Sequence, residues 1–590
     1  MFLRMKTRRK DGKVHRYWTV VENRRCAGGR VVQRQVLHLG ELNDAQHAGW
    51  VRAVATLDGD GEDQPRQLAL FPEDRADDLP ALADCESVHV RLDAIALENP
   101  RQWGACWLAL GLWDALGLDE FFGARLPPSR KGTRWLNVLK ALVCHQLISG
   151  GSDFRFHREW FAASAMGDLL GEDFRLAQKD KAYRCLDRLT GHKDALFSHL
   201  AKKWKDLFGA TYDLLLYDLT STYFESDPPA DPSSKKRFGY SRDHRPDCVQ
   251  VVIALVVTPE GFPLAYEVLP GNTRDTATLD GFLEKIEERY GKARRTWLMD
   301  RGVPTEETLE KMRGRGIHYL VGTPKGRLTK MEKELAEKPW TQARNSVRVK
   351  LLEREEEFYV YVQSERRVGK ERSMRRRRLR ALLTTLKDLR GRKRLTRDEL
   401  LMALGAAKKQ AGRAWGLVTV TVPKADQAVG EKTFTFALDR AALRRAWRRE
   451  GRYLLRSNHL EQSPEAAWEN YLLLTRIEQA FKDLKGDLSI RPIRHQKESR
   501  VEAHIFVCFL AYCLHTTLRN QARAQAPGLT PAAILETVAN ILMIDVRLPT
   551  TDGREILLRR TTRPSPQTAL LLTQLKLELP PQPPPKINLR

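Results

Sequence analysis

Long apolar runs are missing from this sequence. No stretch of roughly 18 consecutive apolar residues, the least that a membrane-spanning helix needs, occurs in its 590 residues. The N-terminus is basic and no apolar core follows it, so it does not have the pattern of a signal peptide. We therefore expect a globular protein without a membrane segment, long enough for roughly three or four domains.

Cysteine is also scarce. The eight cysteines are scattered and form no Cys-x-x-Cys motif, which disfavours a zinc site built from thiolates. Such usage is typical of a reducing compartment. We predict that the cysteines are reduced and mostly buried, and that the protein is cytoplasmic.

Acidic residues are too few to balance the basic ones. The chain has 75 Asp and Glu against 100 Lys and Arg, which gives a net charge of +25. This excess of positive charge predicts a polyanionic partner, and nucleic acid is the favoured one. A membrane surface is disfavoured because no Lys-rich amphipathic anchor stands out.

Two patterns divide the first 208 residues. Residues 1–70 alternate as strands around a Gly28-Gly29 turn and predict a basic β module, which could grip a DNA backbone or be a solvated sheet edge. Polar residues 59–78 predict a linker. Residues 71–208 predict a helical DNA-binding module, with periodic stretches at Trp103–Leu116, Thr133–Ile148, Lys181–Leu189 and Lys193–Phe208.

An α/β pattern begins near residue 209. Buried-type strands and a helix over Thr276–Tyr290 predict the first part of a sheet domain over residues 209–325. Residues 326–465 interrupt it as a predicted insertion domain, rich in strands and in basic helix. Residues 466–545 supply the second part of the sheet domain. Residues 546–590 are predicted to be a C-terminal tail, whose Pro-rich end is extended or disordered.

The centre of the insertion is a very basic segment, Arg366 to Arg397. Arg375, Arg376, Arg377 and Arg378 follow one another at its middle. A run of charge is often a solvated face. This run carries so much of the excess charge of the chain that we favour phosphate contact.

One helix is predicted over Tyr471–Lys485, because apolar residues recur at three- and four-residue spacing. Beside the apolar stripe, Tyr471, Glu478 and Lys485 recur every seven residues, so they would lie in one line, roughly 10 Å apart. These side chains could stack a base, hold a metal and bind a phosphate. An ordinary amphipathic helix with a solvated charged face explains the same pattern.

Two aspartates are predicted to end short apolar strands of the sheet domain. They are Asp218, after Tyr212-Asp-Leu-Leu-Leu-Tyr, and Asp300, after Thr296-Trp-Leu-Met. Ligands of α/β folds collect at such strand ends, although a lone Asp there is often a turn former or a helix cap. With Glu478 the two aspartates make three carboxylates, which could hold two Mg²⁺ ions roughly 3.5–4 Å apart for phosphodiester hydrolysis.

The ordered set of motifs around these carboxylates resembles the DDE transposases of bacterial insertion sequences. The likeness is to the IS-four-like superfamily, which carries a tyrosine–arginine–glutamate–lysine signature. In this chain Leu474 stands where the signature has its arginine. The basic hairpin that ends in His38-Leu-Gly-Glu41 fits a branch of that group. The supporting motifs are Tyr217-Asp-Leu-Thr-Ser-Thr222, Phe238-Gly-Tyr-Ser-Arg-Asp-His-Arg-Pro-Asp247, Gly261-Phe-Pro-Leu264, Pro270-Gly-Asn-Thr-Arg-Asp275, Met299-Asp-Arg-Gly302 and Leu488-Ser-Ile-Arg-Pro-Ile-Arg-His-Gln496.

The resemblance implies an RNase H-like catalytic domain, a mixed sheet flanked by helices and split by the insertion. It implies cleavage at transposon ends with two Mg²⁺ ions, for which Mn²⁺ can substitute, and strand transfer by the freed 3′-OH. Asp218, Asp300 and Glu478 would be the catalytic metal ligands. Tyr471, Lys485, Arg301 and the four consecutive arginines of the insertion would contact DNA.

The implied partners are double-stranded terminal inverted repeats and target DNA, bound by a homodimer on paired ends. The protein would then be nucleoid-associated while bound to DNA. Two other functions compete with this one. A domesticated or inactive DNA-binding protein is disfavoured because all three carboxylates are present. An RNase H-like nuclease without strand transfer is disfavoured by the long insertion and by the Tyr–Glu–Lys pattern.

Overall fold

The computed structural model describes the chain apart from residues 11–12, 26–30, 44–45, 52–53, 55–88, 275–277, 291–294, 324–330, 332–333, 336, 345, 393, 585 and 590. The chain forms two compact units. The larger unit contains Met1–Lys6, Arg16–Trp297 and Leu473–Arg590, and the smaller contains Thr7–His15 and Leu298–Leu472. The predicted Gly28-Gly29 turn, the linker at 59–78 and the predicted start of a helix at Thr276 lie outside the described residues.

Within the first 40 residues, β1 (Phe2–Lys10), β2 (Lys13–Arg25) and β3 (Val31–Gly40) form a three-stranded sheet. Strands β2 and β3 pair antiparallel from Trp18 opposite Gly40 to Arg25 opposite Val31. Val20, Val21, Leu37 and Leu39 are buried, and the register of β2 on β3 shifts between the two consecutive valines.

The four helices predicted between residues 103 and 208 are confirmed to within a few residues. They are α2 (Gly104–Ala115), α4 (Trp135–Ile148), α8 (Lys179–Leu186) and α9 (Lys193–Phe208), with the short helices α3 (Leu118–Gly123), α5 (Asp153–Arg155), α6 (Phe161–Ala163) and α7 (Met166–Leu170) between them.

The long helix α18 (Glu498–Gln525) contacts α2, α4 and α8. It is long and apolar enough to cross a membrane, but 94% of its apolar window is buried inside the protein, as in a core helix. The six cysteines in the described part of the chain are all free and buried, as predicted.

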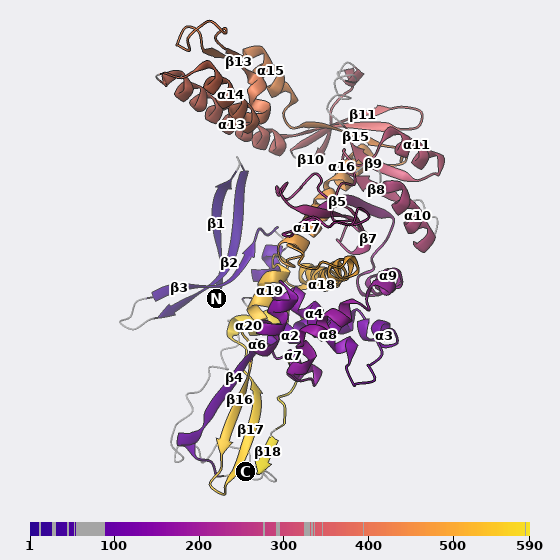
Figure 1. Ribbon diagram of the computed structural model, residues 1–590, viewed down its shortest axis with the longest axis vertical. Helices are drawn as coiled ribbons and strands as arrows, with labels where there is room; N and C mark the ends of the chain where they lie inside the picture. The colour runs from indigo at the N-terminus through magenta and orange to yellow at the C-terminus, as the bar shows by residue number, and fades with distance from the viewer. Residues whose placement is uncertain are drawn as a thin grey trace. The chain divides into compact units, whose positions relative to one another are not determined.

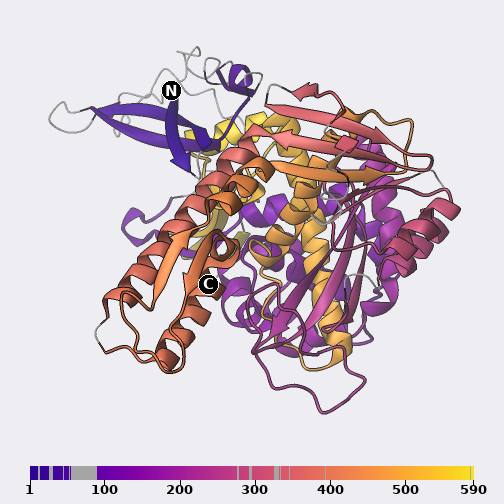
Figure 2. The same ribbon diagram turned by 90° about the horizontal axis from the view of Figure 1, so that it is seen from above.

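The largest sheet is mixed and has nine strands in the order β10-β11-β12-β15-β9-β8-β5-β6-β7. In the larger unit, β5 (Leu214–Phe224), β6 (Val249–Val257) and β7 (Pro263–Pro270) pair antiparallel. Every residue of β6 is buried. Tyr266 of β7 packs on Phe509 of α18, with ring centroids 4.7 Å apart, so α18 covers one face of these strands (Figures 1 and 2). Between β7 and β8 (Thr296–Met299) lies α10 (Leu279–Tyr290).

The predicted insertion boundary at residue 326 is wrong as a boundary of the fold. In the smaller unit, β15 (Arg452–Ser457) pairs with β9 (His318–Gly322), which precedes that boundary and follows α11 (Glu306–Gly314). Strands β12 (Phe358–Ser364), β11 (Val347–Glu353) and β10 (Thr341–Arg344) then continue the same sheet. The pairing of β9 with β15 joins residues more than a hundred positions apart, so it leaves no local sequence signal.

The separate part of the insertion lies between β12 and β15. Helices α13 (Glu365–Gly391) and α14 (Arg397–Ala411) pack with the hairpin of β13 (Val418–Thr421) and β14 (Thr435–Leu438), which Figure 2 shows beside α13, and α15 (Arg440–Arg449) follows. Their core contains Leu382, Leu386, Leu400, Leu404 and Phe434. The predicted basic helical segment is therefore α13, whose apolar residues cluster in its second half.

The predicted C-terminal tail is folded. Strands β16 (Leu542–Pro549), β17 (Arg554–Thr561) and β18 (Lys586–Leu589) form a four-stranded antiparallel sheet with β4 (Ala96–Gln102) in the order β18-β17-β16-β4 (Figure 1). Helices α19 (Pro531–Val538) and α20 (Pro566–Gln574) flank the two long strands in sequence. The sequence-based prediction failed because β4 precedes β16 by more than 400 residues.

Candidate active site

Asp218 does not end its strand, as the sequence predicted, but lies in the middle of β5 opposite Leu255 of β6. The strand continues through Thr220, Ser221 and Thr222, which pair with apolar residues of β6. The two threonines are β-branched, which suits strand positions. The Asp218 side chain is half-buried, and its Oδ1 accepts a hydrogen bond of 2.8 Å from the Leu219 amide. The local backbone therefore fixes this carboxylate.

Asp300 directly follows β8, as predicted. Its side chain is exposed, and its Oδ1 accepts a hydrogen bond of 2.8 Å from the Arg301 amide. The Val303 amide donates to the Asp300 carbonyl oxygen at 3.1 Å, so the chain turns immediately after the carboxylate. The two aspartates thus share one local arrangement, in which the next amide holds the carboxylate.

The single helix predicted over Tyr471–Lys485 is wrong. Helix α16 (Pro464–Leu472) ends and α17 (Leu474–Lys485) begins around Leu473. The sequence has no Pro, Gly or capping residue there, so nothing in it predicts the break. Tyr471 therefore belongs to α16, while Glu478 and Lys485 belong to α17.

Glu478 is exposed on α17, whose apolar stripe is buried at Ile477, Phe481 and Leu484 as predicted. The helix packs against β5. The larger unit therefore brings the helix that carries Glu478 onto the strand that carries Asp218.

Tyr471 and Arg301 come together in the smaller unit. Burial raises the pKa of Tyr471, and the charge of Asp300 raises it further. A Cβ atom at Gly322, the last residue of β9, would lie 2.6 Å from the Tyr471 Oη and 3.4 Å from the Arg301 Cβ. The absence of a side chain at Gly322 thus lets Tyr471 pack at this strand end beside Arg301.

Lys485 is committed to an ion pair. Its Nζ lies 2.7 Å from the Asp243 Oδ1, and the Asp243 side chain, 4% exposed, is also paired with Arg491. Burial lowers the pKa of Lys485, while Asp243 opposes that shift. Through this contact the end of α17 holds the loop that contains Phe238 to Asp247.

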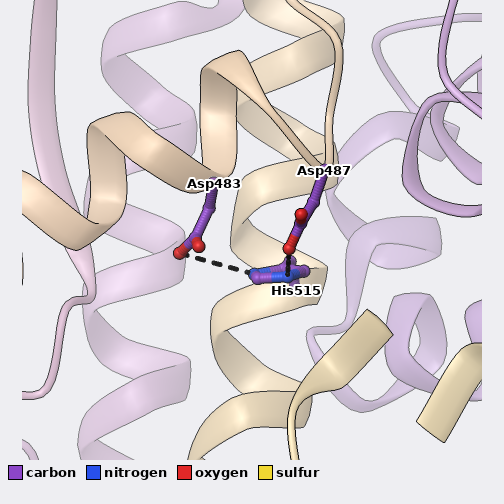
Figure 3. Close-up of side chains that lie close together, drawn as sticks. All are labelled: Asp483, Asp487 and His515. Carbon is purple, nitrogen blue, oxygen red and sulfur yellow. Dashed lines mark ion pairs between the residues drawn. The ribbon is translucent and has the colours of Figure 1, made fainter. Parts of the chain in front are cut away.

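A second group of acids lies at the end of α17. Asp483, Asp487 and His515 of α18 present ligand atoms within 4.8 Å of one another (Figure 3). The His515 Nε2 lies 3.4 Å from the Asp487 Oδ2, and hydrogen bonding to His515 lowers the pKa of Asp487. Reasoning from sequence missed this group because its histidine is far away along the chain.

Two of the ligand groups in this second group, the Asp483 carboxylate and the His515 Nδ1, already have partners. The buried Asp483 accepts hydrogen bonds from Arg519 and, at 2.7 Å, from the side-chain amide of Gln479. Arg519 also lies 3.1 Å from the His515 Nδ1. A guanidinium beside the carboxylate opposes a second cation by charge repulsion, so the network joins α17 to α18 as a structural ion pair.

The four consecutive arginines of α13 differ from one another. Arg375 is mostly buried and paired with Glu450, and desolvation lowers its pKa. Arg376, Arg377 and Arg378 are exposed. Of the four consecutive arginines that were predicted to contact DNA, three are therefore on the surface.

The comparisons with known proteins agree with the resemblance. A family model described as "Transposase DDE domain" matches residues 209–514, more than half of the 590 residues. A second, described as "IS1634 family transposase, N-terminal domain", matches residues 3–65. No curated protein matches the chain. The first match contains Asp218, Asp300 and Glu478, and the second covers the N-terminal sheet.

Proposed function

Because the chain belongs to the DDE transposases of bacterial insertion sequences, we propose that it cleaves DNA at the ends of its element and joins the 3′-OH ends to target DNA. The observation that carries this proposal is the shared arrangement of Asp218 and Asp300. Each carboxylate is held at 2.8 Å by the next amide. Glu478 adds an exposed carboxylate on a helix that packs against β5.

The three carboxylates suit a hard divalent cation, because Mg²⁺ prefers oxygen ligands and leaves room for water and substrate phosphate. Asp218, Asp300 and Glu478 would hold the metal, with Mn²⁺ able to replace Mg²⁺. When bound, two such ions activate the attacking oxygen and stabilise the leaving oxygen of a phosphodiester. The backbone amides at Leu219 and Arg301 keep the carboxylates oriented.

Contacts to the DNA are proposed for two groups of side chains. Tyr471 and Arg301, packed at the end of β9 beside Asp300, would contact DNA near the cleaved end. The exposed Arg376, Arg377 and Arg378 would contact phosphates along the duplex. We propose that the protein acts in the cytoplasm on terminal inverted repeats and target DNA as a homodimer on paired ends.

The direct test uses the full chain and a plasmid that carries the DNA flanking its coding region. With Mg²⁺ the proposal predicts cleavage at the element ends and joined products in a target plasmid, both lost when the metal is chelated. Cleavage without joined products would identify a nuclease instead. A band shift without cleavage would identify a domesticated binding protein.

A further inference from the structure

We propose that Phe238 and Tyr240 form a stacking platform for an unpaired base of the DNA substrate. The inference rests on the proposed function and adds to it a contact that recognises a base rather than the backbone. Tyr240 is 82% exposed and Phe238 52% exposed, although aromatic side chains of this size usually bury most of their surface. They lie on the loop between β5 and β6.

The backbone beneath the two rings is tightly held. A Cβ atom at Gly239, between them, would lie 2.0 Å from the Gly271 carbonyl oxygen. The side-chain amide of Gln250, on β6, donates to the carbonyl oxygens of Tyr240 at 3.1 Å and Gly271 at 2.8 Å. Exposed rings on a fixed backbone lose little conformational freedom when a ligand stacks on them.

The same loop is attached to both elements that carry catalytic carboxylates in the larger unit. The Arg242 amide donates to Ser221 Oγ at 3.2 Å, and Ser221 lies three residues after Asp218 on β5. Asp243 pairs with Lys485 at the end of α17. The platform is therefore held in a fixed relation to Asp218 and to the helix of Glu478.

The charge around the rings suits a nucleic acid. Between residues 235 and 245 the chain has one acid, Asp243, and five basic residues, Lys235, Lys236, Arg237, Arg242 and Arg245. Asp243 is neutralised by Lys485 and Arg491. Nearby, Arg245 pairs with Glu225 and Asp247, and Lys235 pairs with Glu498 and Glu502, so two of the five basic residues are engaged by acids.

Exposed aromatic rings among basic side chains are how proteins hold single strands, with one base stacked on each ring. In an intact duplex the faces of internal bases are covered by their neighbours, so the platform fits a base that strand separation or cleavage has uncovered. The partner is accordingly DNA with an unpaired segment.

The experiment measures binding of full-length protein to two oligonucleotides of the same terminal sequence, one fully paired and one with a three-nucleotide unpaired end. The unpaired end contains 2-aminopurine, whose fluorescence is quenched by stacking. For wild type we expect tighter binding of the unpaired form and quenching. Tyr240→Ala should weaken that binding roughly ten-fold and abolish quenching, while Tyr240→Phe, which keeps the ring, retains both.

Binding of the fully paired oligonucleotide should be the same for all three proteins, as should their thermal unfolding, because the Tyr240 side chain is exposed. Equal quenching and affinity for Tyr240→Ala and wild type would overturn the platform, and metal-dependent cleavage by the same preparations would show that the proposed function survives. If Tyr240→Ala weakened binding of the paired and the unpaired oligonucleotide equally, the stacking platform would also be overturned. Failure of wild type to bind any DNA would overturn both proposals.

Discussion

At the scale of single residues, Gly322 controls where Tyr471 can lie. An added methyl group would meet the Tyr471 hydroxyl at 2.6 Å, so Gly322→Ala should displace the ring from Arg301. We predict that cleavage falls by up to about 100-fold, as misplacement of a group near the chemistry can cost. The matched control is Gly302→Ala, because nothing lies within 4 Å of a Cβ there. Equal cleavage rates for the two variants would contradict a role for the position of Tyr471.

A substitution at Lys485 distinguishes between two roles of this side chain, holding Asp243 and contacting a DNA phosphate. If its task is to hold Asp243, Lys485→Ala leaves that buried carboxylate with Arg491 as its remaining ion-pair partner. The free energy of unfolding should then fall by about 1.5–3 kcal/mol, the range for hydrogen bonds to charged groups, as measured by chemical denaturation. Unchanged stability with weakened binding to terminal DNA would instead support direct phosphate contact.

These residues also show what sequence can and cannot predict about a site. The sequence correctly predicted that Asp300 follows a short apolar strand and that Glu478 lies beside the buried apolar stripe of a helix, because both signals are local. The Asp243 partner of Lys485 and the Gly322 contact of Tyr471 join residues more than a hundred positions apart. Such contacts depend on how strands pair, and no local pattern contains that information.

At the scale of elements, helix α13 has both exposed arginines and one paired arginine, Arg375, which serves as a control for electrostatic binding of DNA. Replacing the exposed Arg376, Arg377 and Arg378 with Gln should make the salt dependence of DNA binding shallower, by at most about 2.7 in the slope of log K against log salt. Arg375→Gln should leave that slope unchanged and lower stability, because Arg375 is paired with Glu450. Titrations at several salt concentrations measure the slope. An equal change in slope for both variants would contradict the distinction between the exposed Arg376, Arg377 and Arg378 and the paired Arg375.

Helices and strands were predicted correctly from the sequence where the apolar periodicity was strong. The prediction failed where an element depends on pairing with a segment far away in the sequence. Helix α9 was predicted with both of its ends, Lys193 and Phe208. The break at Leu473 was not predicted, because three consecutive leucines continue the helical pattern through it. Strands β4 and β16 pair although more than 400 residues separate them in the sequence, and for this reason the C-terminal segment was predicted to be a tail.

At the scale of the whole molecule, the chain that matches the transposase family contains two groups of side chains that are candidates for holding a metal ion. One is the set of Asp218, Asp300 and Glu478 inferred from the family pattern. The other is Asp483, Asp487 and His515, whose ligand atoms lie within 4.8 Å of one another. The ion pair of Asp483 with Arg519 favours a structural role for the second group.

The most direct measurement of the central claim is Mg²⁺-dependent cleavage of element-end DNA by four single variants of the full chain. We predict that Asp218→Asn, Asp300→Asn and Glu478→Gln each abolish cleavage while leaving DNA binding intact, because each removes a carboxylate ligand. Asp487→Asn, in the competing group and 48% exposed, should cleave at nearly the wild-type rate. Full cleavage by any of the first three, or loss of cleavage confined to Asp487→Asn, would contradict this assignment of the active site.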